Sequence, residues 1–196
     1  MASSPYFDAA EFETNWETLV NHPDAPLVNR ATQGLYPPGT TLFPFILAAQ
    51  PNLIQQAPNP GRYFQLDSNN LSCAFSIEGD ITWSNLISNG CEKGQHALIN
   101  SIDAQIIMGL FDNLGFFTSP KLHLPTAEIP IPNLTDPAIL PTANNTMLIS
   151  PLQMAIAASS FSNEGVVPGA RIVSAVQDPL DGWNTLPKLQ GNVNGM

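Results

Sequence analysis

The chain has 196 residues and a formal net charge of −10, with 16 acidic against 6 basic side chains, and 43% of its residues are hydrophobic. This composition favours one packed domain, with two small ones as the alternative, and excludes a disordered chain, which would be poor in apolar residues. The negative charge disfavours nucleic acid as a partner, and the sequence lacks a polybasic patch for anionic lipid. No apolar run approaches the roughly 20 residues that span a bilayer.

The N-terminal quarter predicts short helices separated by turns. Asp8 is expected to cap a short helix that runs through 16–20. The proline- and glycine-rich stretch GLYPPG, 34–39, predicts a turn. The apolar stretch TLFPFILAAQ, 41–50, then predicts a helix that tolerates Pro44 because the proline lies in the first turn.

The middle of the chain combines loops with further helices. RYFQL, 62–66, predicts one short strand within a loop region. DITWSNLISNG, 80–90, predicts a helix with Asp80 or Thr82 as its cap and Gly90 at its end.

A second helix is expected over 95–114, where apolar residues recur at helical spacing, and Gly115 ends it. The proline-rich segment 118–141 predicts an extended connection, because proline is excluded from interior strands.

The clearest helix lies in the last third. Ser150 is its predicted cap, Pro151 its first residue, and Asn163-Glu164-Gly165 its end. ARIVSAV, 170–176, alternates and is rich in β-branched residues, which predicts a strand, and a turn-rich tail begins at Gln177.

The two cysteines, Cys73 and Cys91, do not reveal their state. A disulfide that closes a loop of about 18 residues would stabilise the fold by roughly 3 kcal/mol, and two free core thiols are the alternative. The scattered histidines and the cysteines match no zinc spacing, so neither a metal nor a cofactor is predicted.

Three sequence blocks resemble the transpeptidase domain of penicillin-binding proteins. NRATQGLYPPGTTLFPF, 29–45, resembles the entry to that family's active site, NRA followed by Y-x-P-G-S-T-F-K-P. NGCEKGQHALINSIDAQIIMGLFDNLGF, 89–116, resembles the helix between the S-x-N motif and a G-F turn. SPLQMAIAASSFSNEGVVPGARIV, 150–173, resembles the T-P-L-Q-x-A helix, its A-N-x-G end and the next strand. The blocks occur in family order, and with MASSPYFDAAEF at the start the resemblance covers nearly the whole chain.

The first catalytic motif departs from the family pattern. In the family, the serine of S-x-x-K is the nucleophile, and the lysine three residues later accepts its proton. Here Thr40 stands at the nucleophile position and Phe43 at the lysine position. Phenylalanine cannot accept a proton, and Arg62 is the only charged side chain from Gln33 to Gln65. An alcohol without a base loses orders of magnitude in rate.

The second and third motifs depart as well. The S-x-N position holds Gly90, Cys91 and Glu92, and a shift of two residues gives Ser88-Asn89-Gly90, which still lacks the asparagine. A thiol nucleophile at Cys91 is a further alternative. The family's K-(S/T)-G triplet is missing, because Lys188 is followed by Leu189 and Gln190.

Structural roles compete with chemical ones at the first motif. The Thr40 and Thr41 hydroxyls can cap a helix by accepting free backbone N–H groups. Phe43 is expected to be a buried aromatic that fills the core or a cleft.

The resemblance implies an α+β fold, a partial transpeptidase-like domain with helices packed on an antiparallel sheet. It further implies a single domain over 1–196, incomplete because part of the sheet and the K-T-G strand lie outside the chain. We expect an inactive domain that binds peptidoglycan or cell-wall assembly proteins outside the cytoplasm, anchored by a segment upstream of residue 1. Two alternatives remain: an active D,D-transpeptidase or carboxypeptidase with Thr40 as nucleophile, and a structural subunit of a larger complex.

Overall fold

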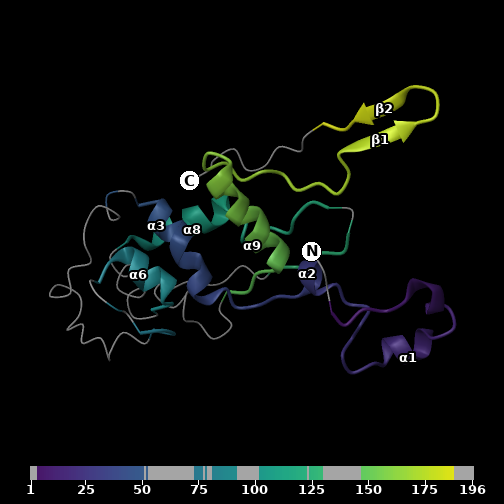
Figure 1. Cartoon of the computed structure of the whole chain (residues 1–196), viewed down its shortest axis with the longest axis horizontal. Coiled ribbons are helices and arrows are strands. Elements are labelled where there is room, and N and C mark those ends of the chain that lie inside the picture. Colours follow the sequence, from purple (N-terminus) through teal and green to yellow (C-terminus); the bar gives the residue numbers. More distant parts are fainter. Residues whose placement is uncertain are drawn as a thin grey trace. The chain divides into compact units, whose positions relative to one another are not determined.

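The computed structural model describes residues 4–50, 52, 73–76, 78, 81–91, 102–122, 124–129 and 147–187 (Figure 1). The chain divides into two compact units. Unit 1 comprises Met1–Tyr36, Leu114–Ile129 and Ile149–Gly195, and unit 2 comprises Pro37–Asn113 and Pro130–Leu148 with Met196. That both units form one transpeptidase-like domain stays a prediction.

Unit 1 begins with short helical segments, as predicted. A 3-10 turn spans Ala9–Glu11, and α1 spans Trp16–Val20. Asp8 caps the turn, because its carboxylate accepts the N–H of Ala10 at 2.9 Å. The predicted cap is confirmed, although the turn and α1 are two separate segments. The next helix, α2, spans Arg30–Gln33.

The strongest helix signal is confirmed in α9, Pro151–Ala158, which continues as a 3-10 turn over Ser159–Ser162. Ser150 and Gln153 form a capping box in which each side chain bonds the other residue's backbone N–H. The buried side chains are Gln153, Ala157 and Ser160, spaced at i, i+4 and i+7 along one face. The helices α2 and α9 contact each other (Figure 1).

The amide of Gln153 joins α9 to the G-F turn, 115–118. Its Nε2 donates to the carbonyl oxygens of Gly115, Phe116 and Thr118 at 3.1, 3.3 and 3.1 Å. A primary amide has two hydrogens, so the three carbonyls share them. The side chain is only 2% exposed, so these bonds are made away from water.

The described part of the proline-rich connection is extended and is held by α2. The Thr32 hydroxyl donates to the carbonyl oxygen of Pro125 at 2.8 Å, and the Thr32 carbonyl accepts the N–H of Ala127 at 3.0 Å. The backbones of Tyr36 and Ile149 also exchange two hydrogen bonds in an antiparallel bridge. Residues 130–141 of the predicted connection lie outside the described residues.

The strand predicted over 170–176 is misplaced. The structure forms a hairpin of β1, Ala175–Asp178, and β2, Gly182–Thr185. Its turn decides the position: the Asp178 carboxylate accepts the N–H groups of Leu180 and Asp181, and Gly182 takes a φ of +78°. The turn therefore places the paired residues after 174. The α+β class with an antiparallel sheet is confirmed, and the sheet in the described residues is this hairpin.

Unit 2 is helical in its described part. A 3-10 turn, Gly39–Leu42, leads into α3, Phe43–Ala48, and two more helices follow, α6 at Trp83–Ser88 and α8 at Ala104–Asn113. The helices predicted over 41–50 and 80–90 are confirmed, and Thr82 caps α6 by accepting the N–H of Asn85 at 3.1 Å. Residues 95–101 of the helix predicted over 95–114 lie outside the described residues, and so does the strand predicted over 62–66.

Most side chains of α3 are buried and apolar, and α8 has buried apolar side chains on one face. In α8 they recur three and four residues apart, as on a helix with one buried face. The buried residues of these two helices are Phe43, Phe45, Ile46, Leu47, Ile107, Leu110 and Phe111. None of the described helices is long and apolar enough to cross a membrane.

Candidate active site

The nucleophile position lies on an exposed turn. Thr40 belongs to the 3-10 turn Gly39–Leu42, and its side chain is exposed. The predicted capping role is wrong: neither this turn nor α3 has a side-chain cap, and the Thr41 hydroxyl donates to the carbonyl oxygen of Pro38 instead. Thr40 therefore presents a hydroxyl on the surface without a capping function.

The lysine position is occupied by a buried ring, as predicted. Phe43 is 1% exposed and begins α3, with Pro44 in the first turn. The Phe43 ring contacts the Trp83 ring of α6, with 5.9 Å between centroids and 51° between planes. The sequence did not reveal this partner, because 40 residues separate the two aromatic rings along the chain.

The described residues of unit 2 contain few ionisable side chains. The described residues of unit 2 include no lysine, arginine or histidine, and their ionisable side chains outside the disulfide are Glu78, Asp103 and Asp112. Within that part of the chain, no hydrogen bond joins the Thr40 hydroxyl to a basic group. Among the described residues, the Thr40 hydroxyl therefore has no basic partner that could activate it as a nucleophile.

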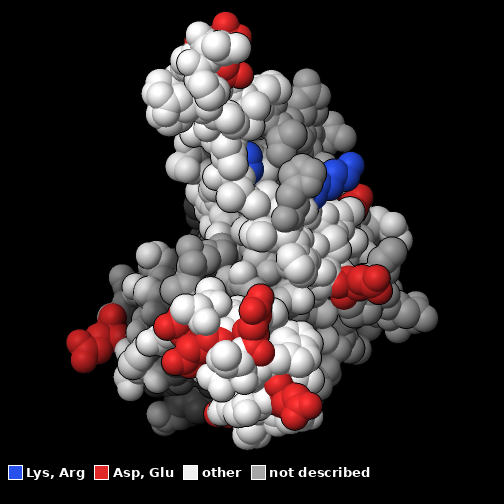
Figure 2. Space-filling model, turned by 90° about the vertical axis from the view of Figure 1, so that its right-hand side faces the viewer, with Lys and Arg blue, Asp and Glu red and all other residues white. Residues whose placement is uncertain are grey.

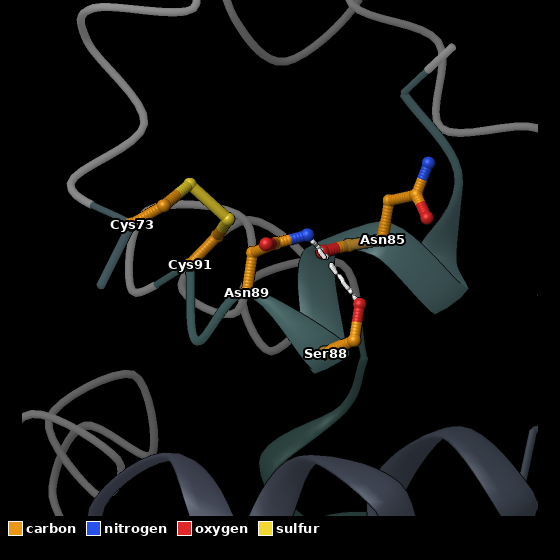
Figure 3. Close-up of a disulfide and its surroundings, with 5 residues drawn as sticks. All are labelled: Cys73, Asn85, Ser88, Asn89 and Cys91. Atoms are coloured by element: carbon orange, nitrogen blue, oxygen red, sulfur yellow. Dashed lines mark hydrogen bonds between the residues drawn. A yellow bond between two sulfur atoms is a disulfide. The ribbon is translucent and has the colours of Figure 1, made fainter. Parts of the chain in front are cut away.

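The S-x-N position is closed by a disulfide. Cys91 is fully buried and is bonded to Cys73 (Figure 3), so a thiol nucleophile at this position is excluded. The backbone strengthens the link, because the N–H groups of Ala74 and Phe75 donate to the Asn89 carbonyl at 2.9 and 3.3 Å. The pairing that the sequence left open is thus decided by the fold.

The residues around the disulfide are engaged in local contacts. Gly90 has a φ of +60°, which ends α6 and turns the chain toward Cys91. In the alternative register, Ser88 and Asn89 bond the last turn of α6: both side chains donate to the Asn85 carbonyl, at 3.4 and 2.8 Å (Figure 3). They complete a helix end and present no free catalytic pair.

Several predicted site residues are not placed by the structure. Glu92, the third residue of the S-x-N position, lies outside the described residues, as does Lys188 near the expected third motif. The placed residues Thr40, Phe43, Gly90 and Cys91 all belong to unit 2, where the contact between Phe43 and Trp83 joins α3 to α6.

Sequence comparison finds a likeness to known proteins over one short stretch of the chain. No protein-family profile matches the chain. A stretch of 51 residues is 41% identical to the peptidoglycan D,D-transpeptidase MrdA of Escherichia coli strain K12, and equally to that of strain O157:H7. The match covers 24% of this chain and 8% of MrdA.

Structure comparison extends the likeness to almost the whole chain. Penicillin-binding protein A from Mycobacterium tuberculosis gives a TM-score of 0.74 at 19% identity, covering 98% of this chain and 49% of the other. The D,D-transpeptidase domain of a peptidoglycan glycosyltransferase from Eggerthella lenta gives 0.73 at 21% identity, covering 98% and 53%. This chain therefore has the fold of a partial transpeptidase domain and spans about half the length of these solved chains, which confirms the resemblance.

Proposed function

We propose that this chain is a catalytically inactive transpeptidase-like domain with a binding or scaffolding role in peptidoglycan assembly. Two likenesses support the cell-wall setting: the shared fold and the 51-residue match to a peptidoglycan D,D-transpeptidase. One solved neighbour, penicillin-binding protein A, is an acyl-enzyme complex with imipenem, so that protein reacts covalently with a β-lactam.

The buried Phe43 is the observation that carries the proposed loss of activity. It stands three residues after Thr40, where the resemblance expects the base, and its ring is 1% exposed against Trp83. General-base catalysis contributes about 10²- to 10⁴-fold to such reactions. Without the base, Thr40 is an ordinary alcohol and opens no amide or β-lactam at a useful rate.

The disulfide supports a location outside the cytoplasm. Disulfides persist in oxidising compartments and are rare where thiols are kept reduced. The bond between Cys73 and Cys91 also ties down the backbone of the S-x-N position, where Cys91 is buried and offers no polar group to a substrate. An upstream membrane anchor remains part of the proposal.

The proposed inactivity is tested by incubating the folded, oxidised chain with benzylpenicillin and recording its intact mass over time. We expect no acyl adduct, while an active transpeptidase treated in parallel acquires one. Thr40→Ala serves as the matched variant, because Thr40 is exposed and its loss leaves the fold intact. An adduct on the natural chain that disappears in Thr40→Ala would refute the proposal and support the enzyme.

The binding role needs its own measurement. Cosedimentation with purified peptidoglycan sacculi tests for direct binding, and chemical crosslinking with membrane extracts of a wall-synthesising cell tests for protein partners. We expect saturable binding in one of the two assays. Failure in both, with inactivity retained, would leave only the structural-subunit alternative.

A further inference from the structure

An apolar groove of about 680 Å³ lies in unit 1, beside the hairpin. Two segments form it, residues 121–122 of the extended connection and residues 171–187 around the two strands. Its apolar lining consists of Leu122, Ile172, Val173, Val176, Leu186 and Pro187. The groove and the candidate active site belong to different units, because Thr40, Phe43, Gly90 and Cys91 are all in unit 2.

The hairpin segment contributes two apolar side chains to this groove, Val176 and Leu186. Val176 pairs with Asn184, and Gln177 pairs with Trp183. Because side chains alternate along a strand, Val176 and Trp183 lie on opposite faces of the hairpin. Leu186 lies two residues beyond Asn184, so its side chain is on the same face of the hairpin as Val176. Leu186 and Val176 are 41% and 50% exposed, so the described residues cover these two side chains only in part.

Two basic side chains complete the lining, Lys121 and Arg171. They are two of only 6 basic residues in a chain of net charge −10, and no acidic residue is among the described residues that line the groove. Among the charged side chains on the face shown in Figure 2, acidic ones predominate. A groove with two basic and no acidic side chains in its described lining therefore differs from the charge balance of the chain. Arg171 Nη1 donates to the Leu186 carbonyl at 3.3 Å, so the guanidinium is held at the lining. Among the described residues, neither cation forms an ion pair with a carboxylate.

We propose that this groove binds a monomeric single-chain amphiphile with an anionic head, such as a long-chain carboxylate. The apolar lining would take the alkyl chain, and the two cations would bind the head by charge-assisted hydrogen bonds. The groove's volume lies within the roughly 300–1,000 Å³ that is typical of small-molecule sites. A stable protein interface is a different kind of surface, which buries about 800 Å² on each partner. The inference does not rest on the proposed function and applies whether or not the domain is catalytic.

The first measurement compares head groups on the complete chain. Isothermal titration with dodecanoate, below its critical micelle concentration, should show one saturable site. Dodecylammonium, with the same chain and the opposite charge, should bind at least about tenfold more weakly, which is 1.4 kcal/mol. Decanoate should also bind more weakly, by about 3- to 4-fold for each missing methylene, or 0.8 kcal/mol.

Two neighbouring substitutions then locate the site. Val176→Asp places a carboxylate in the groove, and Gln177→Asp places the same charge on the opposite face of the same strand. We expect the first to weaken dodecanoate binding by at least about tenfold and the second by less than about twofold. Both residues are exposed, so circular dichroism should show both variants folded.

A charge-removing pair tests the role of the cations. Lys121→Gln with Arg171→Gln should abolish the preference for dodecanoate over dodecylammonium, whereas the charge-conserving Lys121→Arg with Arg171→Lys should keep it. Equal binding of the two head groups by the natural chain would overturn the proposal. Equal effects of Val176→Asp and Gln177→Asp, or binding to phosphatidylglycerol vesicles without binding of monomeric dodecanoate, would also overturn it.

Discussion

Replacing Gln153 by methionine should destabilise unit 1 strongly. The methionine side chain has a similar length and, being apolar, costs less to bury, so the loss would come from the missing hydrogen bonds. The glutamine amide donates to three carbonyl oxygens of 115–118, and its Oε1 accepts the Ser150 N–H at 2.9 Å. Methionine has no donor for the three carbonyls, and its sulfur is only a weak acceptor for the Ser150 N–H. The substitution therefore removes both the tie to the G-F turn and half of the capping box.

The expected cost is set by these bonds. A buried hydrogen bond contributes about 1 kcal/mol net, and leaving a buried polar partner without it costs about 1–3 kcal/mol. Three or four such contacts, partly offset by the added apolar surface, give an expected loss of about 2–3 kcal/mol. With a urea m-value of about 2 kcal/mol/M, the midpoint should fall by about 1–1.5 M.

Urea unfolding monitored by circular dichroism measures this shift. The matched control is Gln105→Met on α8, where the same substitution affects an exposed side chain and should change the free energy of unfolding by less than about 0.5 kcal/mol. Ser150→Ala should cost about 1 kcal/mol through loss of the cap alone. A Gln153→Met midpoint equal to that of the Gln105→Met control would refute the anchoring role.

Two further pairs of substitutions test the described packing by the same unfolding assay. Phe43→Ala should lower the free energy of unfolding by about 3–5 kcal/mol, because it leaves a cavity at a site that is 1% exposed. Phe75→Ala, at a site that is 70% exposed, should change it little. Equal losses would contradict the burial of Phe43. Gly182→Ala should destabilise by about 1–2 kcal/mol, because its φ is +78° although its surroundings are open. Gly109→Ala, equally open and inside α8, should instead stabilise by about 0.5–1 kcal/mol, and equal signs for the two glycines would contradict the backbone argument.

Local signals predicted the helices well because each one rests on neighbours in the sequence. Ser150 with Gln153, and Thr82 with Asn85, are caps whose two partners lie three residues apart, and the structure contains both. The strand was misplaced because its position depends on a pairing partner. Alternation favours 170–176, but the Asp178 turn selects residues 175–178 and 182–185.

The candidate site shows the same division. The motif position of Phe43 and the lack of a base beside Thr40 are evident from order along the chain. The Trp83 contact, the disulfide and the groove each join segments far apart in sequence. No periodicity or spacing records such a contact, and only the folded backbone decides whether Cys73 reaches Cys91.

The two altered motif positions support inactivity more strongly together than either does alone. Phe43 is only 1% exposed, so a lysine restored at position 43 would replace a ring that is packed inside unit 2. The S-x-N position would still be held by a buried disulfide. Each position now serves the packing of unit 2, so recovering the chemistry would require rebuilding part of that core. Under the proposed function, these packing roles fit a domain that acts through its surface.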